Sequence, residues 1–366
     1  MFNLHSWSPK CFYFSVIGKI HVQMDSLNNI SIQNISASTL EMVTSPILTR
    51  WVPGVYLLVF VVSTPCNIVS LWLLCLHTKN RNPTIIFAIN LSLTDLIYSA
   101  FLPFQMVYHF QGNDWPFGRI MCSISTIVFY CNMNGSILTT CAISLERYLA
   151  IVYPLRSRHY RTTRNALLVC VFIWTLVLSV QVPVLYKDIT FRVHQLNVTT
   201  CFDILPKGLF SHMTLAFLYF GALLLFFFMV PLLVLVGSYA SILKTLCSSR
   251  HRDTWQSKNQ TIGLIVVVML CFVSCYLPNI LLQTLHLVYF AYGRSLYVYY
   301  KLSLGLNSLS CCIDPFIYYF ASREFRQKLH RKLLCWSHDE ATTEARIDLT
   351  DLRNTTGETS DRHRML

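Results

Sequence analysis

The sequence predicts an all-α membrane protein, a bundle of seven membrane-spanning helices with a short amphipathic helix on the inner membrane face. Of its 366 residues, 54% are hydrophobic and only 13% are charged, whereas soluble domains carry about 25% charged residues. Seven apolar stretches are each about 20 residues or longer, enough to cross a hydrocarbon core of roughly 30 Å. Backbone groups in lipid must bond within their own segment, so each stretch is expected to be a helix.

The seven stretches follow one another from residue 52 to residue 320. We expect helices over residues 52–76, 84–108, 119–152, 166–186, 210–243, 260–289 and 296–320. No sequence repeat relates the first half of the chain to the second, which argues against an inverted-repeat transporter.

The third stretch contains the most informative charges. The segment from Cys122 to Arg147 spans about 37 Å as a helix, and its only other charge is Glu146, beside Arg147. Charges at the mouth of a span are costly and usually functional. A snorkelling arginine that marks the membrane interface explains Arg147 equally well, so both interpretations stay open.

Basic residues predict the orientation of the chain. Fifteen Lys and Arg residues lie in the connections and the tail on one side, and nine lie on the other. The positive-inside rule therefore places the N-terminus outside and the tail inside, as an odd number of spans requires. Net charge is +12, but no zinc-knuckle spacing, stacking motif or basic helix repeat is present, so we do not expect nucleic-acid binding.

The two ends of the chain are more polar than the bundle. We expect an extracellular glycosylated N-terminus, the seven-helix domain, an amphipathic juxtamembrane helix and a disordered cytoplasmic tail with kinase acceptor sites. These segments cover residues 1–50, 51–321, 322–336 and 337–366.

The amphipathic helix is predicted because Phe325 and Leu329 share one face and basic residues occupy the other. Cys335 follows it and is placed for palmitoylation. Three sequons would lie outside, at Asn29, Asn34 and Asn197, and are predicted glycosylation sites.

Most of the fourteen cysteines lie within apolar runs, and we interpret them as small buried hydrophobic residues. Cys11, Cys122 and Cys201 remain at the mouths opposite Arg147. One bridge between Cys122 and Cys201, in an oxidising compartment, is the economical prediction.

Motifs in all seven spans resemble those of the rhodopsin-like G-protein-coupled receptors, over about residues 50–336. They are Asn67, Asn90-Leu91-Ser92-Leu93-Thr94-Asp95, Glu146-Arg147-Tyr148, Trp174, Pro231 with Tyr239, Phe272-Val273-Ser274-Cys275-Tyr276-Leu277-Pro278 and Asp314-Pro315-Phe316-Ile317-Tyr318-Tyr319. Within that family, three further motifs resemble the purinoceptor-like branch, which also holds lysolipid and protease-activated receptors. They are Leu102-Pro103-Phe104, Trp115-Pro116-Phe117-Gly118 and Phe129-Tyr130-Cys131-Asn132-Met133.

The resemblance implies a plasma-membrane receptor and not an enzyme. Its implied partners are an extracellular ligand, a heterotrimeric G protein, here of the Rho-activating class, and arrestin and receptor kinases at the tail. The residues that it assigns to activation and coupling are Glu146, Arg147, Tyr148, Leu155, Tyr239, Tyr276, Pro278, Asp314, Pro315 and Tyr318. Where the family often carries an acid that latches Arg147, this chain has Lys258.

The resemblance implies no cofactor apart from Na⁺ as an allosteric ion. It would bind an oxygen-rich cluster around Asp95, completed by Asn132, Ser136 and Asp314. A protonated Asp95 in a water network is the alternative, because a carboxylate in mid-membrane needs a partner of some kind.

The implied ligand pocket is mostly aromatic and aliphatic, with a few cations at its rim, which predicts an amphipathic, acidic, lipid-like ligand. The residues implied are Tyr108, Phe129, Tyr130, Met133, Lys187, Gln283, His286 and Lys301. Each rim cation is also explained as plain surface charge.

Other ligands and other classes of protein fit less well. A nucleotide needs several cations, and the corresponding positions read Thr126, Ile280, Gln283 and Leu304. The basic cleavage sites expected outside for a protease-unmasked tethered ligand are Lys10, Lys19 and Arg50, and a cut after Arg50 would leave no free arm before the membrane. A light sensor needs a Lys that 303–313 lacks, and an intramembrane hydrolase or transporter has only Asp95 and Asp314 for its chemistry. A non-signalling decoy receptor is disfavoured by the intact Glu146-Arg147-Tyr148 motif.

Overall fold

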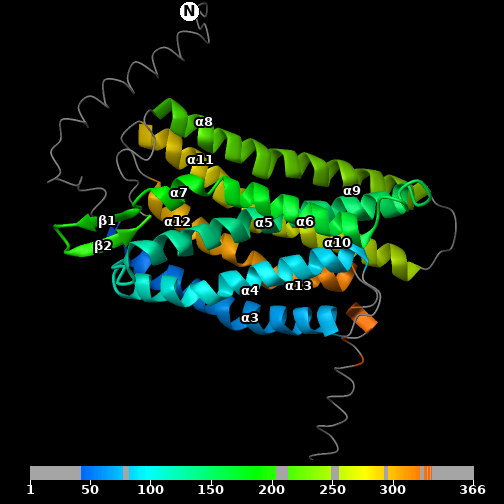
Figure 1. Cartoon of the computed structure of the whole chain (residues 1–366), viewed down its shortest axis with the longest axis horizontal. Helices are drawn as coiled ribbons and strands as arrows, with labels where there is room; N and C mark the ends of the chain where they lie inside the picture. The colour runs from blue at the N-terminus through cyan, green and yellow to red at the C-terminus, as the bar shows by residue number, and fades with distance from the viewer. Residues whose placement is uncertain are drawn as a thin grey trace, which may run out of the picture.

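The computed structural model describes residues 43–76, 82–202, 213–248, 255–291, 296–321 and parts of 325–331. Its helices run side by side along the long axis of the molecule, and a two-stranded hairpin lies at one end (Figure 1). We name this end the hairpin end, and the opposite end, to which α5 carries Arg147, the Arg147 end.

Within the described ranges, helical segments occur at all seven predicted spans, so the predicted all-α bundle is confirmed. The first four comprise η1 Ile47–Trp51 with α3 Val52–Leu76, α4 Pro83–Phe110, α5 Gly118–Val152, and α6 Thr163–Ser179 with α7 Val182–Tyr186. The last three comprise α8 Met213–Leu224 with η2 Leu225–Met229 and α9 Val230–Ser248, α10 Trp255–Cys271 with η3 Phe272–Tyr276 and α11 Leu277–Ala291, and α12 Tyr297–Ser308 with α13 Ser310–Ala321.

Five of these helical segments are long and apolar enough to cross a membrane. The fourth is shorter because α6 ends at Ser179, and the seventh is divided at Leu309 between α12 and α13. Large apolar side chains on the outside of the bundle, such as Leu58, Phe172 and Leu233, are more than half exposed. Such a surface is expected where helices face lipid instead of water.

The three π-helical segments have a common local cause. Proline has no N–H to donate, and its ring clashes with the carbonyl four residues earlier, so the preceding turn widens. Each π-helical segment contains the residue that lies four positions before a proline: η1 precedes Pro53, η2 precedes Pro231 and η3 precedes Pro278. For Pro278 that residue is Ser274. Pro278, which the resemblance assigns to activation as the pivot of the sixth span, therefore follows an irregular turn of the helix.

Polar side chains from the family motifs join the helices to one another. Asn67 on α3 donates to the Cys311 carbonyl of α13 at 3.0 Å. Trp174 on α6 donates to Asn90 on α4 at 2.8 Å, and Asn90 in turn donates to Thr139 on α5 at 3.0 Å. Helices in lipid lack a hydrophobic force between them, so such bonds contribute to fixing their packing.

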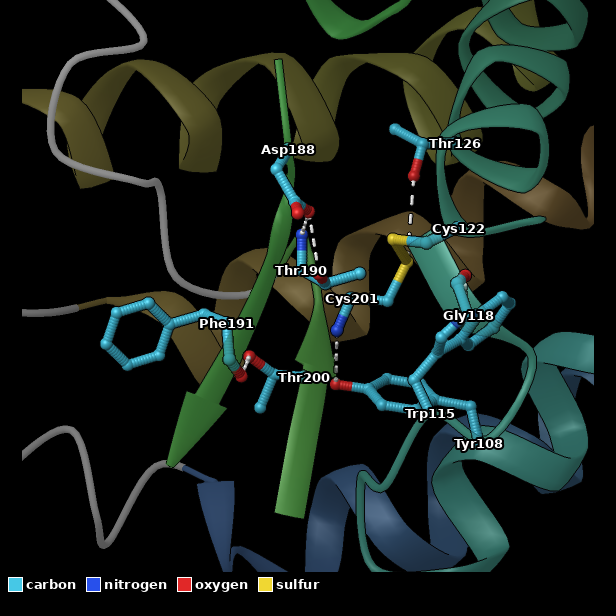
Figure 2. Close-up of a disulfide and its surroundings, with 10 residues drawn as sticks. All are labelled: Tyr108, Trp115, Gly118, Cys122, Thr126, Asp188, Thr190, Phe191, Thr200 and Cys201. Atoms are coloured by element: carbon cyan, nitrogen blue, oxygen red, sulfur yellow. Dashed lines mark hydrogen bonds between the residues drawn. A yellow bond between two sulfur atoms is a disulfide. The ribbon is translucent and has the colours of Figure 1, made fainter. Parts of the chain in front are cut away.

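The hairpin covers one end of the bundle. Strands β1 Thr190–Val193 and β2 Val198–Cys201 pair antiparallel, with Thr190 opposite Cys201. Figure 2 shows the disulfide that joins Cys201 to Cys122 at the start of α5, with a Cα–Cα distance of 5.7 Å. The predicted bridge is confirmed. The Cys201 amide also donates to the Tyr108 hydroxyl at 3.4 Å.

Candidate functional site

At the Arg147 end, one buried carboxylate organises the surrounding side chains. Glu146 is 5% exposed and pairs with Arg147 Nε at 3.1 Å. It also accepts from Arg161 Nη2 at 2.7 Å and Nε at 3.0 Å, and from the Thr84 hydroxyl at 2.9 Å. Arg147 Nη2 donates to the same Thr84 hydroxyl. A snorkelling arginine would extend its head into water, so this network favours the functional interpretation of Arg147.

The resemblance implies that Arg147 is held by Glu146 at rest and meets Tyr239 and Tyr318 on activation. Both tyrosines have other contacts in this structure. The Tyr239 hydroxyl on α9 is hydrogen-bonded to Ser144 on α5. Tyr318 on α13 is 1% exposed, and its ring lies edge-on to Phe325 at 6.4 Å. Since Arg147 bonds to Glu146 and Thr84, the Arg147 end corresponds to the resting arrangement that the resemblance implies.

Two other predicted coupling residues lie at the surface of the same end. Leu155, in the connection after α5, is 89% exposed and therefore accessible to a partner. Tyr148 is half-buried, with its ring edge-on to Tyr153 at 5.7 Å.

Thr84 and Arg161 belong to this network but were missed by sequence reasoning. The available signal was the connection at 153–165, where four arginines follow a single acid, Glu146. Thr84 carried no such signal, because only the packing of α4 against α5 brings it near Glu146.

The side chains predicted to hold an ion meet in the middle of the bundle. Asn132 donates to Asp95 at 2.9 Å, and Asp95 and Asp314 are both fully buried and close enough to interact. Ser136 follows Asn132 by four residues and lies on the same face of α5. One oxygen of Asp95, both of Asp314 and the Ser136 hydroxyl have no hydrogen-bond partner among the described residues.

Two buried carboxylates repel each other unless a proton or a cation lies between them. The unpaired oxygens of Asp95, Asp314 and Ser136 fit a small hard cation, which prefers oxygen ligands. The residues present are therefore compatible with Na⁺.

The sixth span places the predicted Tyr276 in the core. Tyr276 is 2% exposed, and its ring lies edge-on to Phe272 at 5.4 Å. Phe272 stacks in turn on Phe228 of η2 at 5.7 Å, so these rings join the irregular turns of two spans. Pro315 lies in α13, directly after Asp314.

A cavity of about 150 Å³ lies towards the hairpin end, between α5, α8 and α11. Three predicted ligand residues, Tyr130, Met133 and Gln283, line it. The other lining residues are mainly aromatic and aliphatic, and none of those described is Lys, Arg or His. They are Asn134, Gln181, Val184, Phe202, Phe217, Tyr219, Phe220, Gly221, Leu223, Leu224, Phe227, Ile280, Thr284 and Val288.

Two of the other predicted ligand residues lie in an aromatic cluster that continues from Tyr130. The Tyr130 and Tyr300 hydroxyls are 2.9 Å apart, and His286 stacks on Tyr300 with ring centroids 6.0 Å apart. Lys301 lies 5.6 Å from the centre of the Tyr297 ring. His286 and Lys301 are therefore connected to the cavity through Tyr130 and Tyr300, without lining it.

Three predicted ligand residues lie elsewhere. Tyr108 is buried against the hairpin, and its hydroxyl accepts from Cys201, which is a structural role. Phe129 packs edge-on between Tyr98 and Tyr130, and Lys187 is exposed after α7. Only part of the predicted set of ligand residues therefore lines the cavity. The sequence predicts which side chains share a face of one helix, but it does not fix which of them border a cavity between helices.

The structure describes one of the predicted modification sites. Asn197 lies exposed at the turn of the hairpin with φ 54°, and its side-chain oxygen accepts from Arg192 at 3.1 Å. Asn29, Asn34 and Cys335 lie outside the described residues.

Comparisons with known proteins agree with this architecture. The family model "7 transmembrane receptor (rhodopsin family)" matches residues 66–318. The S-geranylgeranyl-glutathione receptor of Homo sapiens is 39% identical over 299 residues, 81% of this chain and 83% of that protein. Purinoceptor 8 of Gallus gallus is 40% identical over 296 residues, which are 81% of this chain and 83% of that protein. Proteinase-activated receptor 1 of Mus musculus is 38% identical over 299 residues, which are 80% of this chain and 68% of that protein. The chain belongs to the rhodopsin family of seven-transmembrane receptors, multi-pass plasma-membrane proteins that bind an extracellular ligand and signal through G proteins, and it is not an enzyme.

Proposed function

We propose that this receptor binds an amphipathic ligand with an apolar chain and an acidic head, and that it activates the Rho-activating class of G protein. The observation that carries the ligand proposal is the cavity, whose described lining is mainly aromatic and aliphatic and holds no cation. A relative at 39% identity is named for S-geranylgeranyl-glutathione, which joins an isoprenoid chain to an acidic tripeptide. The chemistry of that named ligand matches an apolar cavity with His286 and Lys301 nearby.

In this proposal the apolar chain enters the cavity and the acidic head lies towards His286 and Lys301, through the Tyr130–Tyr300 contact. Ligand pockets usually measure about 300–1,000 Å³, more than the 150 Å³ found here. Binding a lipid-sized molecule therefore requires lining side chains such as Phe202 and Phe217 to move. Signalling needs a ligand that binds two states of the receptor with different affinity, and in this proposal the ligand favours the state in which these side chains have moved.

A nucleotide and a tethered peptide are less well supported as ligands. A polyphosphate needs several cationic donors, and the described lining of the cavity contains none. Some relatives are named proteinase-activated receptor 1, but Arg50 lies within η1, directly before α3. Cleavage there would leave no free arm to reach the cavity.

The hairpin end is proposed to face outside the cell. The disulfide at that end is compatible with an oxidising compartment, and the exposed sequon at Asn197 lies on the same side. The basic residues of the 153–165 and 244–259 connections then face the cytoplasm.

The test is G-protein dissociation in cells, measured for all four Gα classes with S-prenyl-glutathione conjugates and acidic lipid extracts. We expect the Rho-activating class to respond, and Arg147→Ala to abolish the response at equal surface expression. Met133→Trp fills the cavity and should raise the half-maximal ligand concentration at least roughly tenfold. Leu218→Trp, on the lipid-exposed face of α8, is the matched control and should leave it unchanged.

Two outcomes would contradict the proposal. Equal loss of potency in both tryptophan variants would remove the cavity as the ligand site. A surface-expressed receptor that dissociates no G protein with any of these ligands would support the decoy interpretation instead.

A further inference from the structure

The Arg147 end of α10 is bound to its neighbours by polar contacts that no family motif includes. Lys258, near the start of α10, donates to the Leu246 carbonyl in the last turn of α9 at 3.2 Å. Carbonyls in the last turn of a helix have no partner within the helix, and a cation there is favourable. Lys258 therefore binds α10 to α9. From the sequence alone, Lys258 indicated only that the acidic residue that often pairs with Arg147 in this family is replaced by a cation.

Arg326, beyond the end of α13, makes the second contact. Its Nη1 donates to the carbonyls of Tyr319 and Phe320 at 2.6 and 3.1 Å, and its Nη2 donates to Gln260 Oε1 on α10 at 2.6 Å. A guanidinium group presents several donors in a fixed plane, so a single side chain can bond to both helices at once. Arg326 thus connects the last turn of α13 to α10.

The third contact is between the backbone of α10 at Gly263 and the ring of Phe320, and it is possible because glycine has no side chain. A Cβ atom at Gly263 would lie 2.7 Å from two carbon atoms of the Phe320 ring, closer than real Cβ contacts. The α10 backbone therefore packs against Phe320 at a distance that alanine would not allow without a shift. Gly263 and Gln260 lie one turn apart, so the close approach and the Arg326 bond act on the same turn of α10.

We propose that Arg326, Gln260, Gly263 and Phe320 form a clamp that holds the sixth span against the seventh in the resting receptor. A contact can shift an equilibrium only if it differs between the two states, and these contacts exist only while α10 lies against α13. The inference rests on the proposed function, because the family resemblance implies that the sixth span moves outward when the receptor activates a G protein. The clamp acts on α10 and is separate from the Glu146–Arg147 pair, which acts on α5.

The test compares Gly263→Ala with Gly237→Ala. Gly237 lies on α9, and a Cβ there meets nothing within 4 Å, so it is a matched glycine in a neighbouring span. Two readouts are taken in the full-length receptor: basal G-protein dissociation in cells, and the distance between labels at positions 259 and 327 in the receptor reconstituted in nanodiscs. Both label positions are exposed; position 259 lies on α10, and position 327 lies in the segment that follows α13.

We expect Gly263→Ala to lengthen the 259–327 distance and to raise basal dissociation by roughly threefold or more, as a population shift. Gly237→Ala should change neither readout. Adding Phe320→Leu to Gly263→Ala gives the new methyl group room and should return both readouts towards the wild type, which a merely misfolded variant would not do.

The polar half of the clamp is tested with a double-mutant cycle. Gln260→Ala and Arg326→Lys should each lengthen the distance, since lysine keeps the charge but not the planar set of donors. The double variant should add little to either single change, because both remove the same bond.

An unchanged 259–327 distance in Gly263→Ala and in Arg326→Lys would show that the clamp does not exist. A longer distance without G-protein dissociation in any variant would keep the clamp and reject the proposed coupling instead. Arg147→Ala further distinguishes failure of the clamp from failure of the proposed coupling, because it should abolish G-protein dissociation and leave the distance between the two labels unchanged.

Discussion

Glu146 shows how much depends on one side chain at the Arg147 end. Its carboxylate is 5% exposed and is shared between Arg147 and Arg161. A buried charge is tolerated when it is paired and hydrogen-bonded, and removing one partner is strongly unfavourable. Arg161 therefore competes with Arg147 for the charge of Glu146, whereas the Thr84 hydroxyl bonds to both Glu146 and Arg147. The balance between the two arginines sets how firmly Arg147 is held.

Glu146→Gln should raise basal G-protein dissociation, because a neutral amide keeps the shape and the Thr84 bond but no longer attracts Arg147. Arg161→Gln is the matched control: it removes a competing cation, so Glu146 should hold Arg147 more firmly and basal dissociation should not rise. Both are measured at equal surface expression. Equal basal activity in the two variants would show that the Glu146 charge does not restrain Arg147.

At the scale of elements, the hairpin is anchored to the helices at several points. The disulfide joins β2 to α5, and the Trp115 amide donates to the Thr199 carbonyl at 2.7 Å. Asp188, just before β1, accepts from the Thr190 amide at 3.0 Å and lies 3.8 Å from Arg119. These contacts position Phe202, which lines the cavity, so the hairpin helps to shape the cavity that we propose as the ligand site.

Cys201→Ser should lower the stability of the folded receptor by about 2–5 kcal/mol, since a cross-link over a long loop restricts the unfolded chain. The bridged residues are 79 apart in sequence. The thermal unfolding midpoint and surface expression should both fall. Cys66→Ser, at an exposed free cysteine, should leave both unchanged, and an equal drop in the two variants would contradict a specific role for the bridge.

Asp188 predicts a pH dependence of the hairpin. Burial alone would raise the pKa of Asp188, but the Thr190 hydrogen bonds and the charge of Arg119 lower the pKa below the ordinary 3.8. A carboxyl group whose pKa is lowered in the folded state stabilises the fold at pH values above its ordinary, unfolded-state pKa. That stabilisation is lost as the pH falls through the folded-state pKa. Hydrogen exchange at the Thr190 amide should therefore quicken, after correction for intrinsic rates, below about pH 4, and Asp188→Asn should abolish this dependence.

At the scale of the whole molecule, the polar cluster of Asp95, Asn132, Ser136 and Asp314 joins α4, α5 and α13 at the middle of the bundle. A cation there would contact three spans at once, so its binding would depend on their relative positions. A change of receptor state that alters the cluster would therefore change the affinity for sodium. Because such coupling is reciprocal, bound sodium would shift the equilibrium between the two receptor states by the same free energy.

Sodium should raise the thermal unfolding midpoint of the purified receptor relative to an equal concentration of potassium, because a ligand that binds only the folded state stabilises it. Asp95→Ala should abolish the difference between the two salts. An identical midpoint in sodium and potassium for the unmodified receptor, combined with a dependence on pH, would support the protonated Asp95 in a water network instead.

The sequence by itself determined the class of fold, the seven spans, the Cys122–Cys201 bridge and the family. These features follow from local properties: a run of apolar residues must be helical in lipid, and motifs such as Glu146-Arg147-Tyr148 are contiguous. The orientation and the modification sites at Asn29, Asn34 and Cys335 were also inferred from local patterns, and they stay predictions.

Only the tertiary structure decided which side chains meet across spans. It connected Glu146 to Thr84 and Arg161, separated His286 and Lys301 from the cavity that Tyr130 lines, and brought Gly263 against Phe320. A pattern along one helix fixes the direction of a side chain relative to that helix. The rotation and spacing of neighbouring helices come from packing many side chains at once, and no short motif encodes them.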